Sequence, residues 1–297
     1  MNRRLVPVLL LVAAAIALPG TTTTTKAEEG YTLRIASLAP AGSSWMKVLN
    51  AWNKTLKDKT DGKLQLRFYP GGSQGDERDF VRKMRVGQLD GGVVTMEGMF
   101  DKEGFKLVGW GDAGKTRLFS MQPITSPNDI KSMRPWAWKD DPIFLEFYKV
   151  IGASAVKLGV PEVYPALQTR MVDVISSSAL TAVALQWYTR VKYMTAHNSA
   201  IIVGGTMMRK DKYDELPDDI KAVFDSTAAR AHELLNKVVR RDDQKAYDVV
   251  LKKGIVAVEA GDTKAEWDAV DKAVRDKLTG RSFSKSLVAA VIEASKP

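Results

Sequence analysis

Trp136 and Trp138 lie two residues apart in a run that begins near Arg134 and is bounded by Pro135 and Pro142. If this run is a β-strand, residues two apart lie on the same face, so both indoles point in one direction. Paired indoles form a flat apolar surface, and each carries one N–H donor. Such a surface suits an organic ligand, although a strand buried in the core accounts equally well for the same pair.

The other residue types offer little chemistry. The chain has no cysteine, which excludes disulfides, thiol nucleophiles and zinc sites built from cysteine. His197 has no partner at a useful spacing, and His232 is expected on the exposed side of a long helix. Residues 109–114 match Gly-x-Gly-x-x-Gly without the ribose-binding acid or the βαβ context, so we interpret them as a glycine-rich loop. Asp140 and Asp141 are interpreted as solvated carboxylates. The sequence therefore predicts a binding protein without cofactor or metal, not an enzyme.

The first residues are typical of a secretory signal peptide. Arg3 and Arg4 precede an apolar run over residues 5–18, which is followed by Pro-Gly and a threonine tract. The run is short for a membrane span, and an uncleaved anchor is the alternative. We place cleavage near Ala27, which makes residues 1–27 the signal peptide and predicts a periplasmic location.

The charge of the chain argues against nucleic acid as a partner. Without residues 1–27, 41 basic residues stand against 35 acidic ones, a net charge of +6 in place of +9. Basic and acidic residues interleave, with no Lys/Arg stripe between aromatic residues. With 45% hydrophobic residues and seven tryptophans, the chain can fill the core of two ordinary α/β domains or one large one.

The order of the expected elements predicts an α/β fold. Strands are expected over residues 31–37, 64–68 and 89–95, with helices between them that begin after a serine at 43 or 44 and after Asp76. This β-α-β-α-β order is typical of a parallel sheet.

A second unit of strands and helices begins near Ile124 and includes a helix over residues 142–151. A strand over residues 201–207 follows, and a long amphipathic helix over 217–253 then braces two lobes. The alternative is two helices broken within residues 240–243.

Four short motifs resemble those of one protein family. They are GDER at residues 75–78, GQLD at 87–90, EVYPALQT at 162–169 and MVD at 171–173. In this order they resemble the periplasmic substrate-binding proteins of TRAP transporters, over residues 33–253. The resemblance implies a two-lobed periplasmic-binding-protein fold, class II-like, that closes on a ligand at the cleft and delivers it to the TRAP membrane subunits.

The resemblance also implies a division into lobes. Lobe I comprises residues 28–123 and 204–250 and is shortened near 99–105, whereas lobe II comprises 124–203 and 251–297. The tryptophan run and residues 185–193 resemble a branch of the family whose receptors work with a tetratricopeptide-repeat partner and favour apolar ligands.

Two departures from the family bear on the ligand. Trp136 occupies the place of an arginine that clamps a substrate carboxylate, while Arg134 falls two residues early. Ser176 and Ser177 stand where the family has an amide and an acid. We therefore predict a largely apolar organic ligand.

Two alternatives to that ligand remain open. One is an organic acid bound by Arg134, Lys115 or Arg117. The other is an interaction module without a solute, because of the shortened lobe.

The candidate ligand-binding residues follow from these arguments: Trp136, Trp138, Gln168, Ser176, Ser177, Trp110, Leu38, Thr95 and Arg134. For three of them another role is open. Trp110 fits a core position, residues 176–178 fit the cap of the next helix, and Gln168 fits a hydrogen bond to the backbone.

Overall fold

The structure is a computed structural model that describes residues 30–95, 104–139 and 141–295. The predicted signal peptide and residues 99–103 of the predicted shortening lie outside the described residues. In the described ranges, no helix is long and apolar enough to span a membrane.

The predicted parallel β-α-β-α-β unit is confirmed. β1 (Tyr31–Ser37) pairs in parallel with β2 (Leu64–Tyr69) and β3 (Gly91–Thr95). The connecting helices are α1 (Ser44–Lys59) and α2 (Glu77–Arg85), which begin after Ser43 and Asp76. Both capping side chains accept hydrogen bonds from backbone N–H groups of the first turn, which have no partner within the helix. Apolar side chains on opposite faces of β1 pack against α1 and α2.

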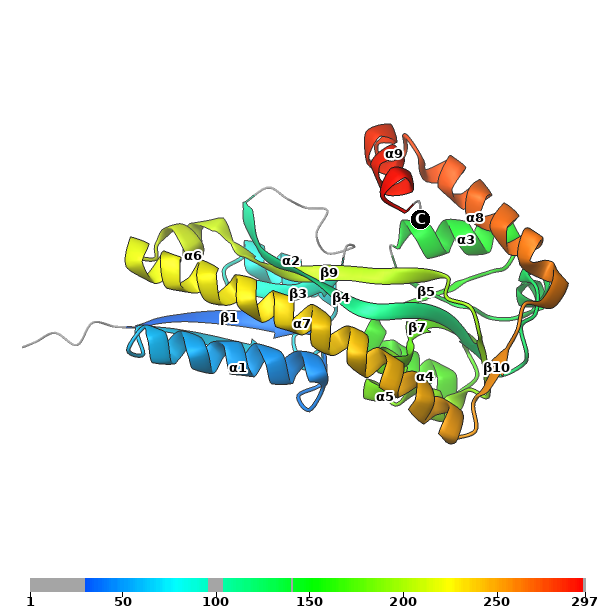
Figure 1. The fold of residues 1–297 in the computed structure, drawn as a ribbon, viewed down its shortest axis with the longest axis horizontal. Helices are drawn as coiled ribbons and strands as arrows, with labels where there is room; N and C mark the ends of the chain where they lie inside the picture. Colours follow the sequence, from blue (N-terminus) through cyan, green and yellow to red (C-terminus); the bar gives the residue numbers. More distant parts are fainter. Residues whose placement is uncertain (1–29, 96–103, 140, 296–297) are drawn as a thin grey trace, which may run out of the picture.

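Two long antiparallel strands carry the sheet from one lobe into the other (Figure 1). β4 (Phe105–Ser120) pairs with β9 (Ala200–Arg209) over most of its length and with β7 (Val174–Ser178) and β8 (Tyr193–Thr195) at its end. β9 also pairs with β3, and β10 (Val256–Val258) pairs with β8. The strand order is β10-β8-β4-β9-β3-β1-β2, and β7 also pairs with β4. β4 therefore belongs to both halves of the molecule.

α7 (Asp218–Lys252) is a single helix of 35 residues, which confirms the predicted bracing helix and contradicts a break at 240–243. It runs under the sheet along the length of the molecule (Figure 1). It packs against α1 at one end, against β4 in the middle and against α5 (Ala179–Ala184) at the other end. The helix thus contacts elements of both lobes.

The prediction of a loop at residues 109–114 is wrong, because these residues lie within β4. Their glycines allow α7 to lie directly on the strand. A Cβ on Gly109 would lie 2.4 Å from the His232 ring, and one on Gly114 would lie 2.7 Å from the Asp243 carboxyl carbon. The glycine pattern reflects close packing of helix on strand and not a phosphate-binding turn.

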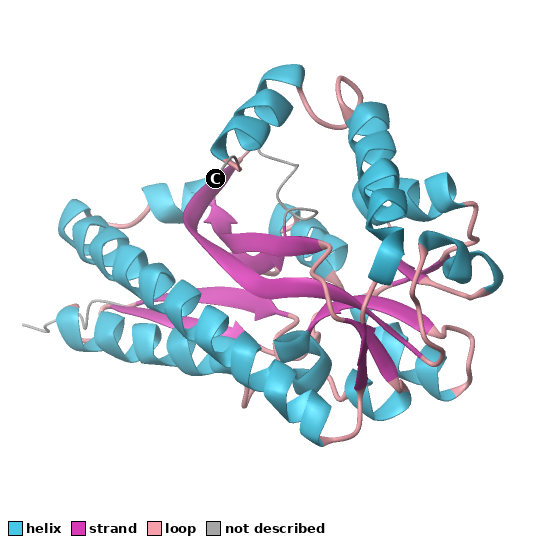
Figure 2. Cartoon of the chain, turned by 45° about the vertical axis from the view of Figure 1, so that its right-hand side comes forward, coloured by secondary structure: helices cyan, strands magenta, loops and turns pink. Residues whose placement is uncertain are grey.

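Most of the remaining elements lie toward the end of the sheet that carries β7 and β8, whereas α6 (Lys210–Asp214) packs at the opposite end, against β9 and β4 (Figure 1). Helices and loops cover the sheet on several sides (Figure 2). β5 (Trp136–Trp138) and β6 (Val156–Leu158) form a separate parallel pair. The helices are η2 (Pro127–Ser132), α3 (Pro142–Ile151), α4 (Val160–Gln168), η3 (Trp187–Arg190), α6 (Lys210–Asp214), η4 (Gly261–Thr263), α8 (Lys264–Leu278) and α9 (Lys285–Ala294). The tryptophan run is therefore a short strand, as predicted.

Candidate functional site

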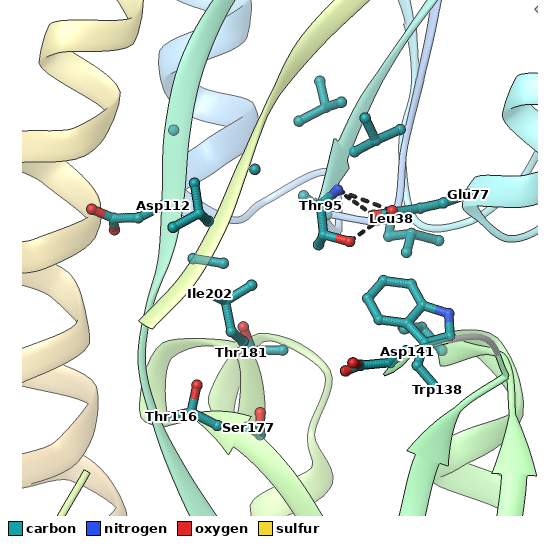
Figure 3. Close-up of a pocket in the computed structure, with 18 of the residues that line it drawn as sticks. Leu38, Glu77, Thr95, Asp112, Thr116, Trp138, Asp141, Ser177, Thr181 and Ile202 are labelled. Atoms are coloured by element: carbon teal, nitrogen blue, oxygen red, sulfur yellow. Dashed lines mark hydrogen bonds between the residues drawn. The ribbon is translucent and has the colours of Figure 1, made fainter. Parts of the chain in front are cut away.

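A cavity of about 610 Å³ lies between the two lobes (Figure 3). One side is formed by the carboxyl ends of β1 and β3, where Leu38 and Thr95 line the cavity. The opposite side is formed by β5 and β7, which contribute Trp136 and Ser176. Clefts at the carboxyl ends of parallel strands and between domains are the usual places for ligands in α/β proteins. The cavity is therefore the candidate binding site.

Five of the seven tryptophans of the chain line this cavity, and we call them the indole wall. Its members are Trp45, Trp110, Trp136, Trp138 and Trp187. The ring centroids of Trp136 and Trp138 are 6.3 Å apart, and those of Trp136 and Trp187 are 5.4 Å apart, with the second pair edge to face. The wall provides a large aromatic surface for an organic ligand.

The indole N–H groups of the predicted pair are bound by the protein. Trp136 Nε1 donates to the carbonyl oxygen of Leu158 at 3.0 Å, and Trp138 Nε1 donates to Asp76 Oδ2 at 2.8 Å. The one N–H donor that each of these indoles carries is therefore used within the protein and not left for a ligand. Both rings present their faces and edges, and Trp136, which is 6% exposed, is also part of the core.

Trp110, Leu38 and Thr95 all line the cavity. Trp110 is 51% exposed on β4, so the alternative of a core position is wrong. The backbone N–H and the hydroxyl of Thr95 both donate to the Glu77 carboxylate at 2.9 Å (Figure 3). The polar groups of Thr95 are therefore already bound, and the group it offers to a ligand is mainly its methyl group.

Ser176 and Ser177 also line the cavity, and Ser178 has the capping role. The Ser178 hydroxyl accepts from the backbone N–H of Thr181 at 3.1 Å, which caps α5. The Ser177 hydroxyl donates to the Ser178 carbonyl at 3.0 Å, whereas Ser176 Oγ is buried without a partner among the described residues. Of the two roles left open for this run, the cap belongs to Ser178 and the cavity to the other two.

Further hydroxyl residues that the sequence did not single out line the cavity: Ser37, Thr116, Thr181 and Thr206. Thr116 on β4 and Thr181 at the start of α5 are both lining residues. Thr116 is fully buried, and its Oγ1 has no hydrogen-bond partner in the described ranges. Nothing in the local sequence distinguishes Thr116 and Thr181, because their place beside Ser176 depends on the pairing of β4 with β7.

The charged lining residues of the described chain are all acidic: Glu77, Asp112 and Asp141. Asp112 Oδ2 accepts from Arg240 Nε at 2.9 Å. Asp141 caps α3, because its Oδ1 accepts from the backbone N–H groups of Ile143 and Phe144 at 2.8 and 3.2 Å.

Burial raises the pKa of Asp141, against the effect of these two hydrogen bonds. Asp141 is thus a half-buried helix cap at the cavity, and Asp140 lies outside the described residues. In the part of the chain that the structure describes, no group of three or more His, Asp or Glu side chains is arranged to hold a metal.

The remaining candidates lie outside the cavity. Gln168, the last residue of α4, is exposed. Arg134 is also exposed and forms an ion pair with Asp173, with Nη2 2.9 Å from Oδ2. Lys115 is exposed, and Arg117 donates to the carbonyl oxygens of residues 195 and 196. Among the described residues, no lysine or arginine lines the cavity.

His232 is buried, so the expectation of an exposed position is wrong. Its Nδ1 lies 2.8 Å from the carbonyl oxygen of Ala228, and its Nε2 lies 2.8 Å from Thr206 Oγ1. A carbonyl only accepts, so we assign the proton to Nδ1 and the accepting role to Nε2. Burial lowers the pKa of this imidazole, which is a structural group between α7 and β9.

Comparison with known proteins relates this chain to a family of solute-binding proteins. The model of the family "bacterial extracellular solute-binding protein, family 7" matches residues 35–100 and 95–280. The 2,3-diketo-L-gulonate-binding periplasmic protein YiaO of Escherichia coli is 22% identical over 267 residues, which cover 76% of this chain and 80% of YiaO. An uncharacterized protein of Haemophilus influenzae is also 22% identical, over 86% of this chain and 89% of its own length.

Two solved structures have the same fold. The TRAP periplasmic solute-binding protein of Citrobacter koseri with bound D-glucuronate has a TM-score of 0.80 and 22% identity, and the match covers 88% of this chain and 99% of that one. The one of Shewanella oneidensis with bound succinate has a TM-score of 0.84 and 14% identity, over 90% and 100% of the two chains. The predicted two-lobed α/β fold with a long helix is confirmed.

Proposed function

Since the chain belongs to the bacterial extracellular solute-binding proteins of family 7, we propose that it captures a small organic solute between its lobes and delivers it to a TRAP transporter. Members of this family are periplasmic receptors and not enzymes, in agreement with the predicted location and class. The observation that carries the proposal is the cavity of about 610 Å³ between the lobes, lined by five indoles.

The relatives favour an organic acid as the solute. YiaO is named for 2,3-diketo-L-gulonate, and the two solved structures hold D-glucuronate and succinate. These names support the alternative of a carboxylate receptor better than they support an apolar ligand. In such a receptor Arg134, Lys115 or Arg117 would have to reach the ligand from its present place outside the cavity.

The lining itself favours the second candidate, a largely apolar solute. The N–H groups of Trp136 and Trp138 are bound within the protein, so these rings offer apolar faces. A carboxylate in this cavity would lack the charge-assisted hydrogen bond of an arginine, which typically contributes about 1.5–3 kcal/mol. The apolar ligand remains a proposal that rests on the composition of the wall.

Three finer expectations also remain proposals. The tetratricopeptide-repeat partner rests on the resemblance of residues 185–193 and the tryptophan run. The shortening of lobe I is supported by the family match, whose two segments meet at residues 95–100. An interaction module without a solute is disfavoured by the size of the cavity, which suits a small organic molecule.

Native mass spectrometry of the protein purified from its source tests the proposed function. We expect a retained small organic molecule that is lost on denaturation. Calorimetric titration with D-glucuronate and succinate then separates the two ligand classes, since tight binding of either acid favours the carboxylate receptor. A protein that retains no molecule and binds neither acid nor any neutral aromatic compound would not be a solute receptor.

A further inference from the structure

Several residues that line the cavity have a buried polar atom without a hydrogen-bond partner among the described residues. In the part of the chain that the structure describes, five buried side-chain atoms lack a hydrogen-bond partner. Three of them, Asp112 Oδ1, Thr116 Oγ1 and Ser176 Oγ, belong to residues that line the cavity. A buried hydroxyl without a partner destabilises the fold that contains it, so such groups in a binding cavity point to a missing partner.

Asp112 is the least suited of the three to contact a ligand. Its carboxylate points toward α7, away from the centre of the cavity (Figure 3), and its Oδ2 is bound to Arg240. Thr116 in contrast lies at the floor of the cavity near Ser177 and Thr181, with its hydroxyl directed upward into the cavity in this view (Figure 3). The two unpaired hydroxyls, Thr116 and Ser176, are therefore the ones to explain.

Strand pairing brings these two hydroxyls to one face of the sheet. Thr116 on β4 pairs with Ser178 on β7, and Leu118 pairs with Ser176. Residues two apart on a strand share a face, so Ser176 lies on the same face as Ser178 and its partner Thr116. The Ser178 hydroxyl already has partners, because it accepts from the backbone N–H of Thr181 and donates to the Thr181 hydroxyl. Thr116 and Ser176 thus form a pair of spare hydroxyls, which we call the hydroxyl floor.

Asp141 sets the charge that a ligand meets on the other side of the cavity. Its carboxylate is directed into the cavity below the Trp138 ring, across from Thr181 and Thr116 (Figure 3). No lysine or arginine among the described lining residues balances it. An anionic ligand would meet a like charge in a site of low dielectric, where repulsion is strong.

We propose that the hydroxyl floor of Thr116 and Ser176 binds the polar head of the solute, and that this head is an uncharged hydroxyl, carbonyl or amide group. Asp141 selects against a carboxylate, and the indole wall takes the ring or chain of the solute. The inference rests on the proposed function as a solute receptor and names the chemistry of its ligand. Hydroxyls both donate and accept, which suits an uncharged head of this kind.

The first test needs no ligand. Thr116→Val and Ser176→Ala remove the spare hydroxyls, so the melting temperature of the ligand-free protein should stay the same or rise. Thr227→Val is the matched control, because the buried Thr227 hydroxyl donates to the Val223 carbonyl at 2.8 Å and accepts from Trp52 Nε1 at 3.1 Å. This control should lower the melting temperature. A comparable loss in Thr116→Val and Ser176→Ala would overturn the proposal, because their hydroxyls would then be bonded within the fold.

The second test measures charge selection with two matched pairs of compounds. The first pair is uracil and orotate, which have the same ring. The second pair is 3-phenylpropan-1-ol and 3-phenylpropanoate, which have the same phenylpropyl chain. In each pair only the second compound carries a carboxylate. Orotic acid is the ligand bound to a related protein of Desulfovibrio salexigens. In calorimetric titrations we expect the uncharged member of each pair to bind at least about 10-fold more tightly than the acid. Thr116→Val should lower the affinity for the uncharged compound about 10-fold.

Asp141→Asn should narrow the preference for the uncharged compound, because asparagine keeps the cap of α3 and removes the charge. Asp129→Asn, which removes a carboxylate outside the cavity, should leave the preference unchanged. Tighter binding of the acids by the wild-type protein would overturn the inference and leave the receptor function intact. If none of the four compounds binds, the molecule retained in native mass spectrometry shows whether the natural solute is charged. A retained anion would overturn the inference. Absence of any retained molecule would instead count against the proposed function.

Discussion

The indole N–H of Trp138 donates to the Asp76 carboxylate across the cleft, with Nε1 2.8 Å from Oδ2. Trp138 ends β5, whereas Asp76 caps α2, next to β3. Gly159, just before α4, lies against the same carboxylate, because a Cβ there would be 2.6 Å from Oδ2. Burial raises the pKa of Asp76, and the bond from Trp138 opposes that shift. The two lobes are therefore joined at one side of the cavity by a hydrogen bond to a partly buried carboxylate.

Trp138→Phe should favour the open arrangement of the lobes, because it keeps an aromatic ring and removes this bond. A hydrogen bond to a charged group contributes about 1.5–3 kcal/mol, so the opening equilibrium should shift by about 10- to 100-fold. Small-angle X-ray scattering of the ligand-free variant should give a larger radius of gyration.

Trp52→Phe is the control for that experiment. Trp52 Nε1 donates to Thr227 Oγ1 at 3.1 Å, between α1 and α7 and away from the cavity. This variant should lower the free energy of unfolding and leave the scattering curve of the folded protein unchanged. Identical radii of gyration for wild type and Trp138→Phe would show that the bond does not hold the lobes together.

Trp110→Ala and Trp136→Ala should separate binding from stability within the indole wall. Trp110 is 51% exposed, so its loss should weaken solute binding by about 1–2 kcal/mol with little change in urea unfolding. Trp136 is 6% exposed, so its replacement by alanine should lower the free energy of unfolding by about 3–5 kcal/mol. Unchanged solute affinity in Trp110→Ala, measured by calorimetry, would remove that ring from the binding surface.

Arg134→Ala should leave solute affinity unchanged, since Arg134 lies outside the cavity and pairs with Asp173. The Arg134 side chain is 53% exposed, so loss of this ion pair should change the free energy of unfolding by no more than about 1 kcal/mol. Asp173→Asn disrupts the same pair and is the control for its structural effect. Loss of D-glucuronate binding in Arg134→Ala alone would establish the organic-acid receptor instead.

Acidification should destabilise the protein through His232. Burial holds the pKa of this imidazole below its ordinary value of about 6.5, so the unfolded chain binds a proton at higher pH than the folded one. The stability that depends on the neutral ring is therefore complete above about pH 6.5 and declines as the pH falls below it.

His232→Gln tests this expectation in urea titrations at pH 7.5 and pH 5.5. The variant should be less stable than wild type at pH 7.5 and should lose less stability on acidification. His197→Gln is the comparison, since burial also lowers the pKa of the half-buried His197. Parallel loss of stability in wild type and in His232→Gln would exclude His232 as the responsible group.

Local sequence patterns were sufficient to predict several helices and strands of the fold. β1, α3 and α7 lie where alternation, capping residues and the 3.6-residue repeat placed them, because these signals depend on neighbours along the chain. The order of elements and the short motifs also identified the family. The glycines of residues 109–114 misled the local reading, since their role appears only when α7 lies on β4.

The candidate site was predictable in part, for a similar reason. The alternation of Trp136 and Trp138 indicated a binding surface, but Trp45 and Trp187 lie in helices where local spacing shows only an apolar position. Thr116 becomes part of the site through the pairing of β4 with β7, whereas Gln168 and Arg134 are exposed outside the cavity.

The sequence by itself determined the type and order of many elements, β4 excepted, as well as the absence of thiol chemistry and the number of indoles. The tertiary structure decided which hydrogen-bond donors remain for a ligand, because the indole N–H groups of Trp136 and Trp138 bind groups that are distant in sequence. The indoles of Trp136 and Trp138 are bound to Leu158 and Asp76, and the hydroxyls of Thr116 and Ser176 have no partner among the described residues. Asp141 lines the cavity. Hydrogen bonding and burial depend on three-dimensional neighbours, and these are fixed only when the lobes pack.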